Sequence, residues 1–142
     1  MKRYMRNGWW ARGLGVAAVC CAAVLCGCES EDTDKDITST RFNVERDLVN
    51  YSSTDEFTWD TTLTQALVTV RINDFREGDT SLRVYDGRGD LVFAVALNTL
   101  NSAYYNGEDL FFQRRTDAGQ AGLWRVVFGY DDFTGDLNIT ME

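Results

Sequence analysis

The sequence predicts an all-β protein, built as a single antiparallel β-sandwich of about eight strands in a jelly-roll-like arrangement. Two observations carry this prediction: apolar residues alternate with other residues at a period of two, and turn signals recur about every ten residues. The folded region, residues 37–142, has the length of one domain. It also has enough chain to bury a core without disulfides.

The alternation is clearest in residues 66–73, 82–85 and 123–130. Weaker runs of the same kind predict further strands at residues 41–50, 57–63, 91–97, 109–115 and 136–141. The segment Asp86-Gly87-Arg88-Gly89-Asp90 separates two runs and predicts a tight hairpin, because glycine readily adopts positive φ angles. The inward register predicts a core that includes Leu82, Val84, Phe93, Trp124, Val126 and Phe128.

The N-terminus has the order of a secretory signal, with four basic residues up to Arg12 followed by an uncharged run over residues 13–27. The run closes on Leu25-Cys26-Gly27-Cys28, which resembles the lipobox of bacterial lipoproteins. The resemblance implies cleavage before Cys28, a diacylglycerol thioether on its sulfur and a fatty acyl group, such as palmitate, on its amine. The apolar run is shorter than the roughly 20 residues that cross a bilayer. A retained anchor helix and plain secretion are the alternatives.

The predicted organisation is therefore a signal peptide over residues 1–27, a lipidated cysteine with an acidic tether over 28–36, and the β-sandwich over 37–142. The tether has no apolar residue after Cys28, so we expect it to be solvated and unstructured. Its acidic run also resembles the surface-export signals of Bacteroidetes lipoproteins, with a plain spacer as the alternative. The expected location is the bacterial cell envelope, at the outer membrane or cell surface in preference to the inner membrane.

Charge limits the possible partners. Of the 14 basic residues four lie in the signal, which leaves ten against 22 acidic residues and a net charge of −12 after cleavage. A polyanion without a basic stripe binds phosphate backbones poorly, so we expect no nucleic-acid partner. Anionic headgroups would also repel it, which leaves the N-terminal lipid as its attraction to a membrane.

Residue usage argues against catalysis. The sequence has no histidine, and its four cysteines lie at positions 20, 21, 26 and 28, so only the lipidated thiol remains after cleavage. Nucleophiles paired with histidine and zinc sites built from Cys and His are thereby excluded. We expect a protein that is not an enzyme and holds no cofactor.

Three groups of residues are weighed as binding sites. Tyr104 and Tyr105 lie between predicted strands, where at least one ring is expected to be exposed and able to contact a sugar or peptide; placement of both rings against the fold is the alternative. Arg88-Gly89-Asp90 is the tripeptide that integrins bind, but the hairpin explains it more simply. Acids cluster in predicted loops at Asp74, Glu77 and Asp79, at Asp86 and Asp90, and at Asp131, Asp132 and Asp136. Calcium binding is one interpretation of these acids, and solvated turns are the other.

A second resemblance covers most of the domain. The segments 80–92, 117–127 and 135–140 are similar to the strand patterns of the bacterial pre-peptidase C-terminal domain and its CUB-like relatives. The resemblance implies a non-catalytic accessory or binding module. We therefore expect a membrane-anchored lipoprotein whose domain binds an envelope protein or glycan. The alternative is an inhibitor or immunity-type lipoprotein that acts on an envelope or foreign enzyme.

Overall fold

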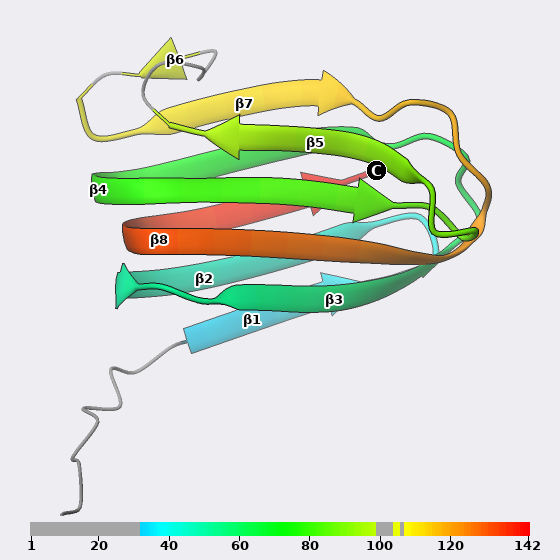
Figure 1. Ribbon diagram of the computed structural model, residues 1–142, viewed down its shortest axis with the longest axis horizontal. Coiled ribbons are helices and arrows are strands. Elements are labelled where there is room, and N and C mark those ends of the chain that lie inside the picture. The colour runs from blue at the N-terminus through cyan, green and yellow to red at the C-terminus, as the bar shows by residue number, and fades with distance from the viewer. Residues whose placement is uncertain (1–31, 99–103, 106) are drawn as a thin grey trace, which may run out of the picture.

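Strands make up all the regular secondary structure in residues 32–98, 104–105 and 107–142, the part of the chain that the computed structural model describes (Figure 1). The strands are β1 Asp32–Ile37, β2 Phe42–Tyr51, β3 Thr54–Thr61, β4 Leu67–Tyr85, β5 Leu91–Leu97, β6 Tyr104–Tyr105, β7 Leu110–Arg115 and β8 Gly122–Met141. Every pairing is antiparallel, which confirms the predicted fold class. No helix in these ranges is long and apolar enough to cross a membrane.

The sandwich forms because the two longest strands bend and enter both layers. β4 and β8 pair from Val68–Met141 to Asn73–Asp136, and again from Asp79–Asp131 to Tyr85–Arg125, with irregular register between the two stretches. The larger layer has the order β1-β2-β8-β4-β7-β6. The smaller layer has the order β3-β8-β4-β5, and it uses the other halves of β8 and β4. Figure 1 shows these two layers face to face, joined where β4 and β8 turn.

The bend depends on glycine at one position above all. Gly78 has a φ of 89°, a left-handed value that side chains disfavour. A Cβ at this position would also collide with the backbone of Asp131 and Asp132 on the neighbouring strand. Asp74 and Asp132 adopt left-handed φ angles of 49° and 47°, as short polar side chains tolerate. β4 and β8 therefore bend side by side, between their two paired stretches.

The inward faces of the two layers form one apolar core, and all six residues predicted for it are buried. Trp59 and Trp124 are both fully buried in this core, with ring centroids 5.6 Å apart in an edge-to-face arrangement. Each indole N–H is satisfied by a loop carbonyl: Trp59 Nε1 donates to Thr38 O at 2.6 Å, and Trp124 Nε1 donates to Gln120 O at 2.7 Å. The tryptophans therefore join the core to the loops at one end.

Arginine side chains close the two open edges between the layers. At the β2–β3 edge, Arg46 Nη1 lies 3.0 Å from Asp55 Oδ2, and the two side chains are 7% and 16% exposed. At the β5–β7 edge, Arg114 Nη2 donates to Ala94 O at 2.8 Å, and its guanidinium lies 4.6 Å from the centre of the Phe93 ring. In both places a long side chain covers apolar surface with its stem and keeps a polar partner for its head.

The predicted strand positions agree with the structure in the alternating regions and differ at the bends. Residues 91–97 match β5. The segments 66–73 and 82–85 belong, apart from Ala66, to the single strand β4, and 123–130 and 136–141 are parts of β8. Residues 74–79 lack apolar alternation because they form the bend. β4 nevertheless pairs with β8 on each side of this bend. The sequence signal for a strand stops there although the strand continues.

The predicted tether over residues 28–36 is wrong from Asp32 onward, because Asp32–Ile37 forms β1 and pairs with β2 along its length. The composition is typical of a solvated segment, and most of the strand is indeed exposed. Backbone pairing with β2 holds it, together with Lys35, whose Nζ lies 4.8 Å from the centre of the Phe57 ring. Residues 28–31 lie outside the described residues.

Candidate ligand-binding face

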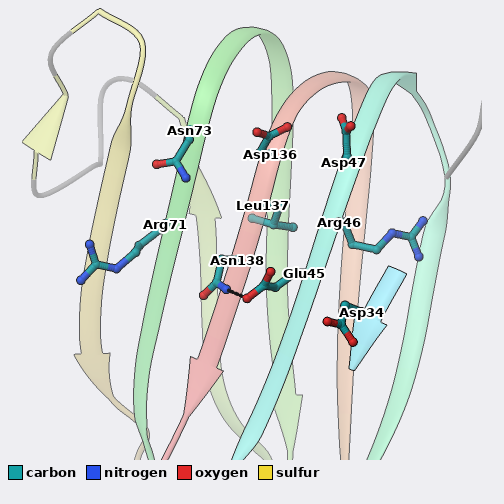
Figure 2. Close-up of a pocket in the computed structure, with 9 residues that line it drawn as sticks. All are labelled: Asp34, Glu45, Arg46, Asp47, Arg71, Asn73, Asp136, Leu137 and Asn138. Atoms are coloured by element: carbon teal, nitrogen blue, oxygen red, sulfur yellow. Dashed lines mark hydrogen bonds between the residues drawn. The ribbon is translucent and has the colours of Figure 1, made fainter. Parts of the chain in front are cut away.

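A shallow hollow of about 720 Å³ lies on the outer surface of the larger layer (Figure 2). Its outward side chains, called the polar face below, are Asp34 from β1, Glu45 and Asp47 from β2, Asp136 and Asn138 from β8, and Arg71 and Asn73 from β4. Leu137, which is buried, also borders the hollow. Arg46 borders it too, but Figure 2 shows its guanidinium turned away.

The polar face is organised in cross-strand rows, because residues directly opposite in an antiparallel pair share one side of the sheet. One row runs Asp34, Glu45, Asn138 and Arg71 across four strands. Asn138 Nδ2 donates to Glu45 Oε1 at 2.6 Å, and Figure 2 shows this bond near the middle of the hollow. Asn43 Nδ2 reaches the same oxygen at 3.4 Å. Glu45 is thus held in place by two amides.

A second row, closer to the bend, sets carboxylates against each other. Asp47 on β2 lies opposite Asp136 on β8, and Asn73 on β4 lies on the other side of Asp136. Partial burial of Asp136 raises its pKa above the ordinary value, and the negative charges of Asp47 and Asp74 raise it further. A hydrogen bond between the carboxyl groups of Asp47 and Asp136 acts in the same direction. This row therefore favours holding a proton or a positively charged ligand group.

A third row, nearer the loops, is neutral and joined by hydrogen bonds. It runs Asn43, Thr140, Thr69 and Gln113. Thr140 Oγ1 donates to Asn43 Oδ1 at 3.0 Å, and Gln113 Nε2 donates to Thr69 Oγ1 at 3.0 Å. One bond ties a side chain of β8 to one of β2, and the other ties a side chain of β7 to one of β4, so amide and hydroxyl groups are held in place beside the hollow.

One edge of the face ends on an aromatic ring. The guanidinium of Arg71 lies 5.1 Å from the centre of the Phe111 ring on β7. β6 continues the layer beyond Phe111, with Tyr104 paired to Phe111 and Tyr105 paired to Leu110. The structure thus places the backbone of the two predicted contact tyrosines next to the polar face. Their side chains lie outside what is described.

The predicted hairpin at Asp86 links two loops through the carboxylate of this residue. The buried carboxylate accepts backbone N–H bonds from Arg88 and Asp90 at 2.9 Å and from Gln120 at 2.7 Å. Burial raises the pKa of this carboxyl, but the three N–H donors and the charge of Arg88 lower it more, so its pKa lies below the ordinary value. Arg88, Gly89 and Asp90 form the exposed tip of this turn.

The loop acids weighed for calcium do not gather into a metal centre. Within residues 32–98, 104–105 and 107–142, no group of three or more carboxylate, histidine or cysteine side chains is placed to hold a metal ion. Asp86 is engaged by backbone N–H groups, and Asp132 Oδ1 accepts a bond from Ser52 Oγ at 3.0 Å. Cys28, the predicted lipidation site, lies outside the described residues.

Sequence reasoning missed the polar face. The available signal was the outward half of each alternation, which is polar on β2, β4 and β8: Asn43, Glu45 and Asp47; Thr69, Arg71 and Asn73; Asp136, Asn138 and Thr140. What the sequence lacked was the order of strands, because β2, β8 and β4 are neighbours in the sheet but far apart along the chain. No family model matches this sequence, and a search of the curated proteins finds no match for it.

Proposed function

We propose that this protein is a bacterial envelope lipoprotein, anchored by lipid on Cys28 at the outer membrane or cell surface, and that its β-sandwich is a non-catalytic binding domain. The basic and apolar leader with its lipobox-like end supports the anchor. The missing histidine, the lack of a free thiol after cleavage and the resemblance to pre-peptidase C-terminal domains support a binding role.

The observation that carries the binding proposal is the hydrogen-bonded polar face across β1, β2, β8 and β4. Its side chains offer carboxylate and amide oxygens as acceptors and amide and guanidinium groups as donors, and the Arg71–Phe111 pair stands beside them. Sugar hydroxyls need such mixed partners, and a ring beside them can pack against a sugar face. An envelope glycan is therefore the ligand that this surface fits best.

The charge of the face narrows the class of glycan. Four carboxylates, those of Asp34, Glu45, Asp47 and Asp136, stand against the single guanidinium of Arg71. Such a surface repels uronic acids and sulfated sugars and tolerates neutral or amine-bearing sugars. We infer a neutral or amino-sugar glycan as the ligand.

The binding test compares matched residues on the two outer surfaces. Arg71→Ala and Glu45→Ala remove groups of the polar face, whereas Arg83→Ala and Glu56→Ala remove the same residue types from the opposite layer. On a panel of neutral, amino-sugar and acidic oligosaccharides, the first two variants should bind about tenfold more weakly or worse, and the control variants should bind as the unmodified protein does. Equal effects on both surfaces, or a preference for acidic sugars, would refute the assignment.

Tyr104 and Tyr105 are proposed as further contacts, since β6 continues the layer beside Phe111. Replacing both with Ala should weaken glycan binding while leaving the melting temperature within about 3 °C. A double variant that unfolds would instead make the two rings structural. One that folds and binds normally would remove them from the contact surface.

The anchor has its own test. Cells that express the protein are fed an alkyne fatty acid, and the protein is then examined for label and for its distribution between membrane and soluble fractions. We expect label on the unmodified chain, and loss of label with release or stalled processing in Cys28→Ser. An unmodified protein that never takes label would eliminate the lipoprotein assignment.

The rigid hairpin supports the second candidate, an inhibitor or immunity-type lipoprotein. Asp86 fixes the exposed tip at Arg88 and Asp90, and Gly87 N donates to Gln120 O at 3.1 Å in the adjacent loop. A preorganised exposed loop is suited to insertion into a partner's cleft. If this candidate holds, Arg88→Ala should abolish capture of an envelope enzyme while glycan binding stays unchanged.

A further inference from the structure

The short distance along the chain between the proposed anchor and the first strand limits how the domain can stand on a membrane. Three residues, 29–31, separate Cys28 from Asp32, where β1 begins. A chain extends by at most about 3.6 Å per residue, so the Cα atoms of Cys28 and Asp32 lie within about 14 Å of each other. If Cys28 carries lipid, as proposed above, the start of β1 is held close to the bilayer surface.

The register of β1 identifies which end of the sandwich this is. Asp32 pairs with Asp47, which itself pairs with Asp136 beside the bend of β8. The other end of β1, Ile37, pairs with Phe42 and leads into the loop that follows. In Figure 1, β1 begins on the side where β4 and β8 turn. We call that side, residues 74–79 and 131–135, the bend end, and the opposite side the loop end.

We propose that the anchored domain stands with its bend end toward the bilayer and its loop end away from it. The strands then run outward from the membrane surface. Both outer faces of the sandwich, including the polar face, are lateral in this orientation. The Asp47–Asp136 row is the part of the polar face nearest the lipid.

The chemistry of the bend end determines how it meets the headgroups. It carries five exposed acids and one basic residue, Arg76. The acids are Asp74, Glu77, Asp79, Asp131 and Asp132. Anionic headgroups repel such a surface over a Debye length of about 8 Å at physiological ionic strength. The bend end therefore faces the bilayer without adsorbing to it when the lipids are anionic, and approaches it more closely when they are zwitterionic.

The loop end, in contrast, is built as a rigid surface. Four loops meet there, and backbone bonds link them: Thr62 N donates to Ser39 O at 3.2 Å, and Gly119 N donates to Thr64 O at 2.8 Å. The bond between Gly87 and Gln120 described above joins the remaining hairpin. The orientation presents this preorganised end to partners that approach from outside.

The experiment supplies the lipid chemically, so that it does not depend on natural acylation. The chain that begins at Cys28 is coupled to a maleimide lipid in vesicles; Cys28 is its sole thiol. A fluorophore is placed through an unnatural amino acid at Glu77 on the bend end or at Arg88 on the loop end, both exposed positions. Energy transfer to an acceptor lipid then reports the height of each end above the bilayer.

On phosphatidylcholine vesicles we expect transfer from position 77 to be at least about twofold stronger than from position 88, because residues 122–130 of β8 alone span about 27 Å. On phosphatidylglycerol vesicles transfer from position 77 should fall, and high salt should restore it. Equal or reversed transfer from the two positions would overturn the orientation. An unchanged signal on anionic vesicles would overturn the repulsion. The fatty-acid labelling test is separate, so failure of the orientation and failure of the lipid anchor are distinguishable.

Discussion

The pKa values of two carboxylates in this domain, Asp86 and Asp136, are shifted in opposite directions by their surroundings. Asp86 is surrounded by backbone N–H groups that favour its charged form. The charged form of Asp136 is instead disfavoured, first by partial burial and then by the facing carboxylate of Asp47. The residue type is the same and both lie beside turns. The two sites therefore predict pH effects on stability with opposite signs.

Replacing Asp86 by Ala should destabilise the loop end, because three backbone N–H groups in two loops would lose their acceptor. We expect the melting temperature to fall by about 5 °C or more at pH 7. Because the pKa of Asp86 is lowered in the fold, its stabilising effect is present above the unfolded pKa of about 3.8 and is lost as the pH falls through the folded value. Asp90→Asn at the exposed tip is the control, and an equal loss in both variants would contradict the role of Asp86.

Asp136→Asn should stabilise the protein at neutral pH. The folded pKa of Asp136 is raised, so ionisation costs stability as the pH rises above about 3.8, and the cost is complete above the folded pKa. The gain in the variant should stay below about 1 kcal/mol, because the pair is exposed, and it should vanish in acid. Urea unfolding across a pH series measures it. Asp60→Asn on β3 is the control, and a gain that persists at low pH would contradict the electrostatic cause.

At the scale of elements, β1 is a strand whose charges oppose its pairing. Asp34 lies opposite Glu45 on β2, and like charges directly opposite destabilise an antiparallel pair. Backbone pairing along the strand and the contact of Lys35 with Phe57 act against this repulsion. β1 should therefore open more easily than β2, which is paired with a strand on each side.

Asp34→Lys should strengthen β1, because it replaces a repulsive cross-strand pair with an attractive one. Amide hydrogen exchange in β1 should slow, by a factor that corresponds to about 0.5 kcal/mol. Asp36→Lys makes the same substitution opposite the neutral Asn43 and should have a smaller effect. If both variants slow exchange equally, the repulsion between Asp34 and Glu45 is not what weakens the strand.

The strands and the core could be predicted where the local sequence pattern determines them. β1 and the polar face could not, because they depend on which strands are neighbours in the sheet. Trp124, Val126 and Phe128 alternate with outward residues, so their burial followed from the period of two. The acidic segment that forms β1 carries no apolar alternation, so its residues carried no signal for a strand. It becomes a strand because it pairs with β2. The polar face was not predictable either, because Glu45 and Asn138 meet only through the pairing of β2 with β8.

At the scale of the whole molecule, the two bent strands belong to both layers, while β1 lies at an edge of one. Deleting residues 136–142 would remove the partner of both β2 and β4 in the larger layer. We expect that chain to lose its near-ultraviolet circular dichroism and its cooperative melting. Deleting residues 32–37, a segment of similar length, should leave a folded domain with a lower melting temperature. A folded protein after the first deletion would contradict the central role of β8.

The position of β8 at the far end of the sequence also has a kinetic consequence. Phe42 pairs with Met141, so one of the earliest core residues waits for one of the last, and most pairings join segments that are distant along the chain. High contact order of this kind slows folding to milliseconds or longer. A chain that crosses a membrane N-terminus first cannot complete either layer until β8 has emerged. For a chain exported as proposed above, the topology therefore delays completion of the sandwich until residues 122–141 have crossed the membrane.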